Sequence, residues 1–476
     1  MNYTESDLIK IAKRLNNKKR SYLLVNPLQA KHMPVSPRRA LEMMDALAFK
    51  IHQRLCPAPV DSASAGGVPS ANGLDSANAA ASTRGATPAG SAVSPGDDIL
   101  TLGFAETATA IGAAIAIRLG GAYIHTTREI LQHADDRLEF LEEHSHATEQ
   151  FLHSANLKEL LTRASHIMLV DDEISTGKTI INTIAALKAY FPEIASKNIF
   201  AVSVVNSMRD ADISRFAALG INAECLLHIE NRDYSEATPQ IEERQFIDCR
   251  GTAALSSPDG AAYATVVLPQ GEVAYAATVL PQGEATCSAT VLPQVKAPSS
   301  AALSDDTMCM SATANCTTFT APICISGKID PRIGVSASAY ADACTNLAER
   351  VIAVAESGLQ RSKSVLVLGT EEFMYPAILT GKLITGKFAG TTVMCHATTR
   401  SPIAVSDCEV YPLNAGYLLR SFYSDSRVTH IYNLTYYDTV ILITDSEIDI
   451  SPACSDLRAA LGVNGYGKLY PFIWSV

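Results

Sequence analysis

Two carboxylates and a hydroxyl-rich turn stand side by side near the middle of the sequence. Asp171 and Asp172 follow an apolar run, and Ser175-Thr-Gly-Lys-Thr179 comes just after them, directly before another apolar stretch. Adjacent carboxylates can hold a diol, or a hydrated Mg²⁺ through water. Hydroxyl and backbone N–H groups at a helix N-terminus bind anions, and Gly177 lets the backbone approach a phosphate closely. Together these groups fit a ribose 5-phosphate.

The elements that must position these groups are a strand and a helix. Residues 167–170 are all apolar, which predicts a parallel strand buried on both faces, and a helix is predicted to begin at Ile180. The ending Gly-Lys-Thr also occurs in P-loops, but that motif needs a glycine where this chain has Asp172, so we reject a P-loop ATPase. The remaining alternative is a strand with an incidental acidic turn.

Residues 166–180 resemble the phosphoribosyl pyrophosphate (PRPP) signature of type I phosphoribosyltransferases, which is an apolar strand, two acidic residues and a Thr/Gly phosphate loop. The resemblance implies PRPP as substrate and Mg²⁺ as cofactor, with Asp171 and Asp172 facing the ribose and the metal. It also implies that the 5-phosphate is held by Ser175, Thr176, Gly177, Lys178 and Thr179. Purine-type members carry an acidic residue at the position of Ser175, so the orotate-type branch fits better than a purine acceptor.

Two loops upstream have the composition of a second anion site. A strand at 99–102 runs into residues 103–107, and a helix is predicted over 110–119. By the same resemblance this loop binds pyrophosphate through Gly103, Phe104, Ala105, Glu106 and Thr107. After the next strand, Arg128 is predicted to pair with pyrophosphate, with hydroxyl donors from Thr126 and Thr127; a surface ion pair is the alternative for Arg128. Residues 142–146 stand where orotate-type enzymes carry a closing hood.

Composition limits the classes of function. The 476 residues have a net charge of −11, which argues against broad nucleic-acid binding. No apolar run is long enough to span a membrane, and the first residues do not resemble a signal peptide. The 11 cysteines are scattered without a C-x-x-C pair, as in reduced packing cysteines. These features predict a cytoplasmic protein that acts on small molecules.

Strands that alternate with helices predict an α/β fold with a parallel sheet. We place a first domain at 1–250, interrupted by an Ala/Ser/Gly/Pro-rich disordered insertion at 57–96. Residues 4–17 are predicted to form an amphipathic helix. In 251–322, Leu-Pro-Gln recurs at 268, 280 and 292, which we interpret as a low-complexity linker rather than a small solenoid. A second α/β domain follows at 323–476.

The second domain contains Thr399-Arg-Ser-Pro402, the signature of the TRSP domain. The chain therefore resembles a phosphoribosyltransferase fused to a TRSP domain, as found in bacterial gene clusters linked to tellurite resistance and stress. This context implies neighbouring enzymes of a nucleoside-like metabolite pathway as partners.

Short motifs of the first domain recur in the second in the same order. Three segments of the first domain resemble three of the second: 102–106 resembles 368–372, 125–128 resembles 397–400, and 170–173 resembles 444–447. We hypothesise that the second domain is a degenerate copy that keeps the arginine loop and lacks the Gly-Lys-Thr loop; chance similarity of short polar loops is the alternative. Orotate-type enzymes dimerise and lend loops to each other, so the assembly is either a homodimer or an internal pseudo-dimer in which Arg400 reaches a shared site.

The predicted activity is transfer of the phosphoribosyl group from PRPP to a nitrogen acceptor, or the reverse, with pyrophosphate released. Catalysis would rest on positioning and charge stabilisation by Asp171, Asp172 and Arg128. The alternative is a protein of the same fold that senses PRPP or nucleotides without turnover.

Overall fold

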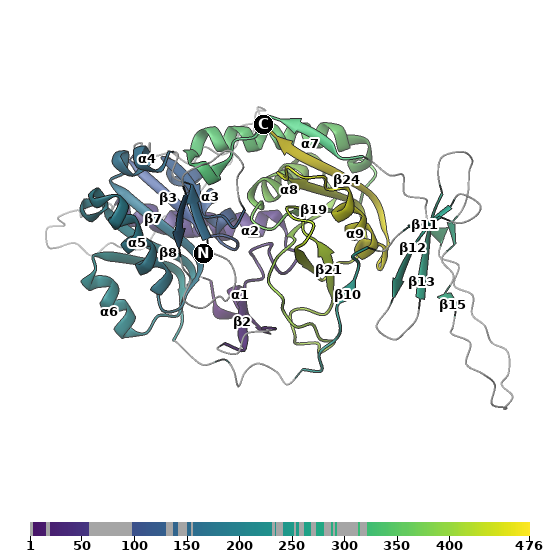
Figure 1. Cartoon of the computed structure of the whole chain (residues 1–476), viewed down its shortest axis with the longest axis horizontal. Helices are drawn as coiled ribbons and strands as arrows, with labels where there is room; N and C mark the ends of the chain where they lie inside the picture. Colours follow the sequence, from purple (N-terminus) through teal and green to yellow (C-terminus); the bar gives the residue numbers. More distant parts are fainter. Residues whose placement is uncertain are drawn as a thin grey trace, which may run out of the picture.

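The computed structural model has two parallel sheets, one in each half of the chain, with a layer of helices between them (Figure 1). It describes residues 3–15, 20–56, 98–129, 150–153, 156–230, 234, 241–251 and 321–476, together with the strands within 137–140 and 254–314.

The first sheet has the strand order β18-β4-β3-β7-β8-β9, and all neighbours are parallel except the edge strand β18. Its strands are β3 (Ile99–Gly103), β4 (Ala122–His125), β7 (His166–Ile174), β8 (Asn198–Asn206), β9 (Ile221–His228) and β18 (Val335–Ser336). The second sheet has the order β17-β24-β23-β19-β20 and is parallel throughout. It contains β17 (Ile323–Ser326), β19 (Ser364–Gly369), β20 (Thr392–Ala397), β23 (Tyr437–Thr444) and β24 (Tyr466–Ser475).

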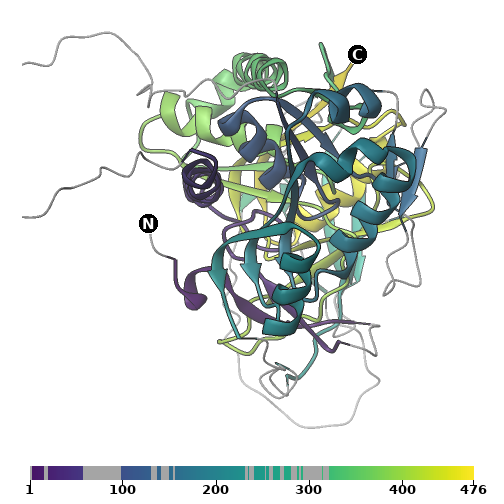
Figure 2. The ribbon, with the colours of Figure 1, turned by 90° about the vertical axis from the view of Figure 1, so that its left-hand side faces the viewer.

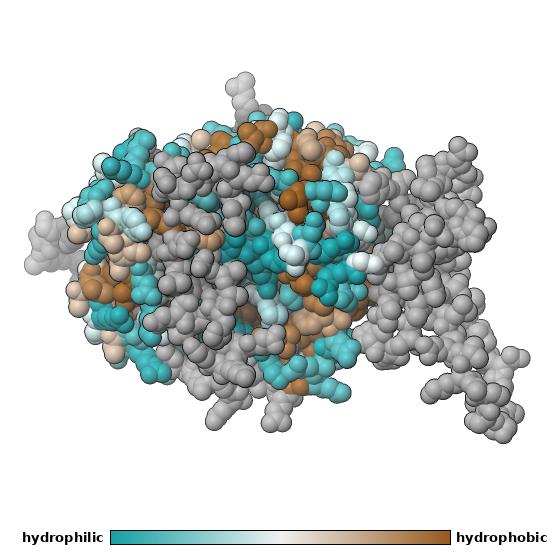
Figure 3. All heavy atoms as spheres, in the orientation of Figure 1, coloured by the Kyte–Doolittle hydropathy of each residue, from teal (hydrophilic) through white to brown (hydrophobic). Residues whose placement is uncertain are grey.

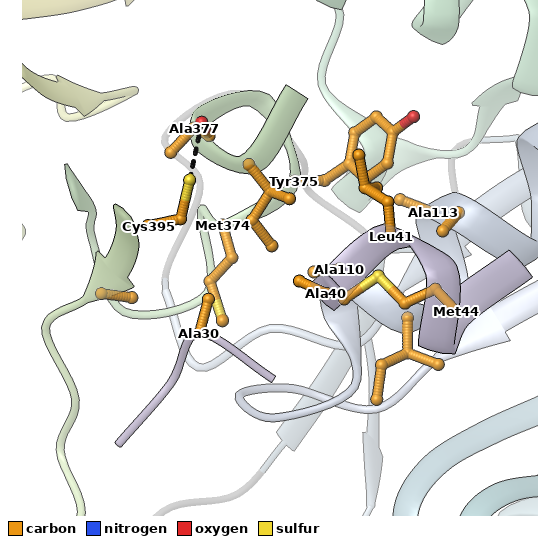
Figure 4. Close-up of a cluster of buried hydrophobic side chains, with 14 of the residues drawn as sticks. Ala30, Ala40, Leu41, Met44, Ala110, Ala113, Met374, Tyr375, Ala377 and Cys395 are labelled. Atoms are coloured by element: carbon orange, nitrogen blue, oxygen red, sulfur yellow. Dashed lines mark hydrogen bonds between the residues drawn. The ribbon is translucent and has the colours of Figure 1, made fainter. Parts of the chain in front are cut away.

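Four helices form the layer between the sheets, and their apolar side chains belong to one continuous core. They are α2 (Pro37–Leu55), α3 (Thr109–Leu119), α7 (Ala337–Leu359) and α8 (Tyr375–Lys387). Figure 4 shows Leu41 and Met44 of α2 close to Tyr375 of α8, with Ala110 and Ala113 of α3 beside them. The two halves therefore share one hydrophobic core instead of having separate cores on this side of each sheet.

Other helices cover the outer face of each sheet. For the first sheet these are α4 (Leu157–Arg163), α5 (Lys178–Tyr190) and α6 (Asp210–Ala218), seen in teal in front of the sheet in Figure 2. Along β7, Ile167 and Leu169 pack toward these helices, whereas Met168 and Val170 pack toward the shared core. This alternation shows why the whole run is apolar, because both faces of the strand are covered.

The outer face of the second sheet is covered by α9 (Ser451–Gly462) and an antiparallel pair, β21 (Gly416–Arg420) and β22 (Val428–Tyr432). The short strand β10 (Ile247–Asp248) adds to β21, so the end of the first predicted domain packs on the second half. The other elements are α1 (Glu5–Leu8), β1 (Lys10–Lys13), β2 (Tyr22–Val25), β5 (Arg137–Phe140), β6 (Gln150–His153) and the 3₁₀ turns Pro192–Ser196 and Pro331–Ile333.

The predicted linker, residues 251–322, contains short strands. They are β11 (Ala254–Ser256), β12 (Ala261–Val267), β13 (Val273–Val279), β14 (Cys287–Ser288), β15 (Val291–Leu292) and β16 (Thr313–Ala314). Four of them form an antiparallel sheet separate from the two main ones. The first insertion and the Leu-Pro-Gln units at 268 and 280 lie outside the described residues, so the interpretation of 251–322 as a linker stays a prediction.

The predicted helix at 4–17 is wrong. Of its described residues, 4–15, only Glu5–Leu8 is helical, and residues 10–13 form β1, which pairs antiparallel with β2. Ala12 and Val25 of this hairpin pack against Ile403 and Val405 of the second half. Pairing and burial against the distant half thus outweigh the local helical pattern. The predicted strands and helices around the signature are confirmed, although β7 extends through the acidic residues to Ile174.

The two halves repeat one plan. In strand order, β4-β3-β7-β8 of the first sheet corresponds to β20-β19-β23-β24 of the second. In each half a glycine ends a strand, β3 or β19, and its carbonyl accepts a hydrogen bond from a threonine that follows the next strand, β4 or β20. These bonds are Thr126 N to Gly103 O (2.9 Å) and Thr398 N to Gly369 O (3.2 Å). That threonine's Oγ1 then accepts from the backbone N two residues past the glycine, Ala105 (2.8 Å) or Glu371 (3.1 Å).

The next threonine of each half also repeats its pairing. Thr127 exchanges two backbone hydrogen bonds with Phe151 of β6, and Thr399 exchanges two with His430 of β22. Short polar loops that matched by chance would not share strand order and this set of bonds. The hypothesis that the second half is a copy of the same plan is therefore supported by the structure.

The copies exchange segments reciprocally. Val35, just before α2, pairs with Cys395 on the edge strand β20 of the second half. Val335, just before α7, pairs with Tyr123 on the edge strand β4 of the first half. Each contact is the counterpart of the other, as in an interface with two-fold symmetry. The expectation of a homodimer or an internal pseudo-dimer stays a prediction.

Among the described residues, no helix is both long enough and apolar enough to cross a membrane. Eight cysteines, among those whose side chains the structure describes, take part in no disulfide.

Candidate functional site

The signature lies at the carboxyl edge of the first sheet. Asp171 and Asp172 are partly buried in the second half of β7, and α5 begins at Lys178. The turn 175–177 between them brings the helix N-terminus next to the two carboxylates, as predicted. A 13-residue helix has free N–H groups and a positive dipole end at this point.

Gly177 is required by two features of this turn. Its φ is +67°, in the left-handed region that favours glycine, and an added Cβ would lie 2.2 Å from the Phe216 ring. Phe216 belongs to α6 and is itself buried in the core on this side of the sheet. Because Phe216 leaves no room for a Cβ at residue 177, the turn needs glycine at this position.

The loop 103–107 meets the signature as predicted, because β3 and β7 are parallel neighbours. Thr107 Oγ1 donates a 2.9 Å hydrogen bond to Asp172 Oδ1. The backbone N–H groups of Phe104 and Ala105 are used within the protein, by Val170 O (2.9 Å) and Thr126 Oγ1 (2.8 Å). Gly103 belongs to β3, and the N–H groups of Phe104 and Ala105 already have partners. An anion at this loop would therefore contact the remaining two residues, Glu106 and Thr107.

The two threonines after β4 have structural hydrogen bonds. The fully buried Thr126 hydroxyl donates to Gln150 Oε1 (2.6 Å), and the fully buried Thr127 hydroxyl donates to Glu372 Oε1 of the second half (2.8 Å). Their predicted role as pyrophosphate donors stays a prediction, since these hydroxyls hold the loop and the two halves in place. Arg128 follows them, partly buried, and its charge acts on Glu106.

Glu106 joins the two halves. Its carboxylate forms an ion pair with Lys31, whose side chain is completely buried, and lies 3.8 Å from Nε of Arg400. Lys31 Nζ also donates to the backbone O of Glu371 (2.7 Å). Burial raises the pKa of Glu106, but Lys31 and Arg400 outweigh it and hold that pKa at about 2. The side chain is therefore ionised at neutral pH.

Around Arg400 lies a larger charged cluster that the sequence predicted only in part. Its members are Lys31, Glu106, Glu129, Glu371, Glu372, Arg400 and Arg427. The repeat of short motifs pointed to Arg400 and its loops, whereas Glu129 and Arg427 carry no local sequence signal. In the view of Figure 3, hydrophilic residues gather in the middle of the molecule, where the halves meet.

Arg20, from the loop before β2, adds a cation beside the signature. Its Nη2 lies 2.8 Å from Glu173 Oε1 and 3.0 Å from Oε2. Burial raises the pKa of Glu173, and Arg20 opposes this rise. The predicted hood, residues 142–146, lies outside the described part of the chain.

A magnesium ion is compatible with the pair Asp171–Asp172. Mg²⁺ is usually held by one or two carboxylates, several waters and substrate oxygens, so it needs no larger protein cluster. Among the described residues there is no group of three or more His, Cys, Asp and Glu side chains arranged for a metal. The two aspartates would therefore hold the ion together with the substrate.

Comparison with known families agrees with this geometry. A family described as "Phosphoribosyl transferase" matches residues 8–232, and a family described as "TRSP domain C terminus to PRTase_2" matches residues 330–461. The chain therefore contains a domain of the phosphoribosyltransferase family followed by a TRSP domain. The phosphoribosyltransferase domain thus contains the signature and its pyrophosphate-type loop, and the TRSP domain is the second copy.

Solved structures of adenine phosphoribosyltransferases are distantly similar. The enzyme from Giardia lamblia has 13% identity and a TM-score of 0.26, and the match covers 47% of this chain and 96% of that one. The enzyme from Saccharomyces cerevisiae has 11% identity and a TM-score of 0.24, covering 46% and 94%. These values carry no argument about function. A search of curated proteins gave no match.

Proposed function

We propose that the phosphoribosyltransferase domain transfers the 5-phosphoribosyl group of PRPP to a nitrogen acceptor. The observation that carries this is the Thr107–Asp172 hydrogen bond, which joins the two anion-type loops at one sheet edge, beside the N-terminus of α5. A PRPP molecule needs these three groups together: a phosphate turn, carboxylates for the diol, and a loop for the pyrophosphate.

In the reaction, the bond between ribose C1 and the pyrophosphate oxygen breaks, and pyrophosphate leaves with the electron pair. The acceptor nitrogen forms the new bond to C1 and loses its proton to water or to a base. Asp171 and Asp172 would bind the ribose hydroxyls and stabilise positive charge on the sugar. Mg²⁺, when bound, would neutralise charge on the leaving pyrophosphate. Residues 175–179 would position the 5-phosphate.

A second candidate function is sensing of PRPP or a nucleotide without turnover. It is favoured by Glu106, which places an ionised carboxylate in the pyrophosphate-type loop. Such a charge would disfavour a bound pyrophosphate unless the neighbouring cations compensate for it. The cellular setting we propose is cytoplasmic, within a nucleoside-like metabolite pathway linked to tellurite or stress resistance.

The test is pyrophosphate release from PRPP with Mg²⁺, measured against a panel of nucleobases and small amines. The control is the Asp171→Asn, Asp172→Asn double variant. We expect release that depends on one acceptor and disappears in the variant. Binding of PRPP by calorimetry without release would favour sensing, and absence of PRPP binding would contradict both functions.

A further inference from the structure

Two arginines of the TRSP domain converge on one carboxylate of the phosphoribosyltransferase domain. Glu129 directly follows Arg128, in the loop after β4. Its Oε1 is in contact with Nη2 of Arg400 and lies 2.8 Å from Nη2 of Arg427. Two guanidinium groups around a single oxygen form the kind of site that binds phosphate oxygens.

This arginine pair lies next to the pyrophosphate-type loop. The backbone N of Arg400 lies 3.3 Å from Glu106 Oε1. The neighbour of Glu106, Thr107, donates to Asp172. A continuous line of contacts therefore runs from the predicted ribose carboxylates to the arginines of the other half.

The guanidinium of Arg400 keeps donor capacity. Its Nε binds Glu371 Oε2 at 2.5 Å and its Nη2 binds Glu129, whereas its Nη1 is buried without a hydrogen-bond partner among the described residues. Its side chain is 11% exposed, and those of Glu129 and Arg427 are 13% and 25% exposed. The pair is thus reachable from solvent, unlike Lys31.

Glu129 is surrounded by charges of both signs. Arg400 and Arg427 attract its carboxylate, whereas Glu371 and Glu372 repel it. Burial raises the pKa of Glu129 to about 7, in spite of the two arginines, and Glu371 and Glu372 add to this rise. Glu129 therefore holds its negative charge less firmly than Glu106, whose pKa the neighbouring cations lower.

We propose that Arg400 and Arg427 of the TRSP domain form a pyrophosphate subsite for the neighbouring domain, which Glu129 occupies until the ligand displaces it. This inference rests on the proposed function and gives the TRSP domain its role. In this proposal the TRSP domain contributes Arg400 and Arg427 to the ligand site of the phosphoribosyltransferase domain and has no ligand site of its own. No covalent step is involved, because Glu129 is exchanged for phosphate oxygens.

The experiment is calorimetric binding of PRPP, inorganic pyrophosphate and ribose 5-phosphate to the full chain, with Mg²⁺. Arg400→Gln and Arg427→Gln are expected to weaken binding of the two pyrophosphate ligands by about 10- to 100-fold, the range for a lost hydrogen bond to a charged group. Ribose 5-phosphate lacks the pyrophosphate, and its affinity should stay unchanged. Arg400→Lys should restore part of the loss.

Glu129→Gln gives the decisive sign, because it removes the competing charge and keeps the shape of the side chain. It should tighten pyrophosphate binding, whereas a cluster that only fastens the halves together would make this variant bind worse or no differently. The matched control is Arg420→Gln, which removes another ion-paired TRSP arginine, the partner of Asp456. Equal weakening for ribose 5-phosphate and pyrophosphate, or weakening in Arg420→Gln as well, would overturn the inference.

The outcomes also separate this inference from the proposed function. If the unaltered protein binds PRPP and releases pyrophosphate while the arginine and glutamate variants behave like it, only the subsite is wrong. If the unaltered protein binds none of the three ligands, the proposed function and the subsite fail together.

Discussion

At the carboxyl end of β7 the chain turns through Gly177 into α5, and at the carboxyl end of β23 it turns through Ile450 into α9. Asp171 and Asp445 stand at the same place in the repeated plan. Asp171 is partly exposed, whereas Asp445 is 3% exposed and is bound by Arg332 Nη1 (2.5 Å), Lys328 Nζ (3.4 Å) and the Tyr423 hydroxyl (2.7 Å). In the second turn Ile450 is buried.

This difference shows that the two halves keep the same scaffold while the equivalent acidic residue is accessible in one half and enclosed in the other. The strand order and the loop hydrogen bonds persist, but side chains of the protein occupy the position where the first half keeps its carboxylates accessible. Burial raises the pKa of Asp445, and Arg332 and Lys328 more than reverse this rise, so the group is held ionised as part of the core. The same acidic residue thus serves stability in one half and, we propose, ligand binding in the other.

The strongest test of this contrast is Asp445→Asn. The substitution takes from the buried Arg332 and Lys328 one of their two shared carboxylate partners and leaves them Asp330. Breaking a buried ion pair by removing one partner costs about 3–5 kcal/mol. Urea unfolding of the full chain should show this loss. Asp449→Asn, at an exposed aspartate of the same turn, should unfold within about 1 kcal/mol of the unaltered protein. An Asp445→Asn protein as stable as the Asp449 variant would mean that the second site is not closed by this pair.

Asp172→Asn should show the opposite balance of effects. We expect pyrophosphate release to fall by about 100-fold or more, since the group is proposed to stabilise charge in the reaction. Stability should change by about 1 kcal/mol, the value of its hydrogen bond with Thr107. Initial rates and urea unfolding on the same preparation would check both. A variant that unfolds easily and keeps its rate would remove the distinction between the two halves.

Gly177→Ala tests the phosphate turn, which the second half lacks. The added methyl meets Phe216 at 2.2 Å in a backbone conformation that L-residues rarely adopt, so we expect a loss of about 2 kcal/mol. Gly220→Ala is the control, because its φ is also positive (+71°) but nothing lies within 4 Å of the new Cβ; it should lose about 1 kcal/mol. Thermal unfolding distinguishes them, and equal losses would show that packing under the turn does not matter.

Two carboxylates of the charged cluster should give pH dependences of opposite sign. The pKa of Glu106 is held at about 2, below its usual 4.5, so its stabilisation is complete above pH 4.5 and is lost as pH falls toward 2. The pKa of Glu129 is raised to about 7, so the folded state loses stability as pH rises from 4.5 to 7. Each slope is at most about 1.4 kcal/mol per pH unit.

The measurement is stability against pH for Glu106→Gln and Glu129→Gln, each compared with the unaltered protein. The stability difference between Glu106→Gln and the unaltered protein should change with pH below 4.5. The difference for Glu129→Gln should change between pH 4.5 and 7, with the opposite sign of slope. Curves of the same sign would contradict the assignment of the two charges.

Local patterns were enough to predict the scaffold around the signature. The apolar run 167–170, Gly177 and the strand-to-loop transition at Gly103 each carry a signal within a few residues, and the structure has the elements there. The region 4–17 was mispredicted because its hairpin is stabilised by Ile403 and Val405, nearly four hundred residues away along the chain. Arg427 and Glu129 were missed for the same physical reason, since their meeting depends on how the copies pack.

The exchange of Val35 and Val335 between the sheets has a consequence for biosynthesis. Tyr123 on β4 pairs with Val335, which leaves the ribosome 212 residues later. N-terminal domains often fold while the rest of the chain is still being made. Here the first sheet keeps an uncovered edge until the second copy has been translated, and an uncovered edge strand invites wrong pairing. The first sheet therefore gains its last edge partner only after residue 335 has been made, and a chain cut between the two halves would leave each fragment with an open sheet edge.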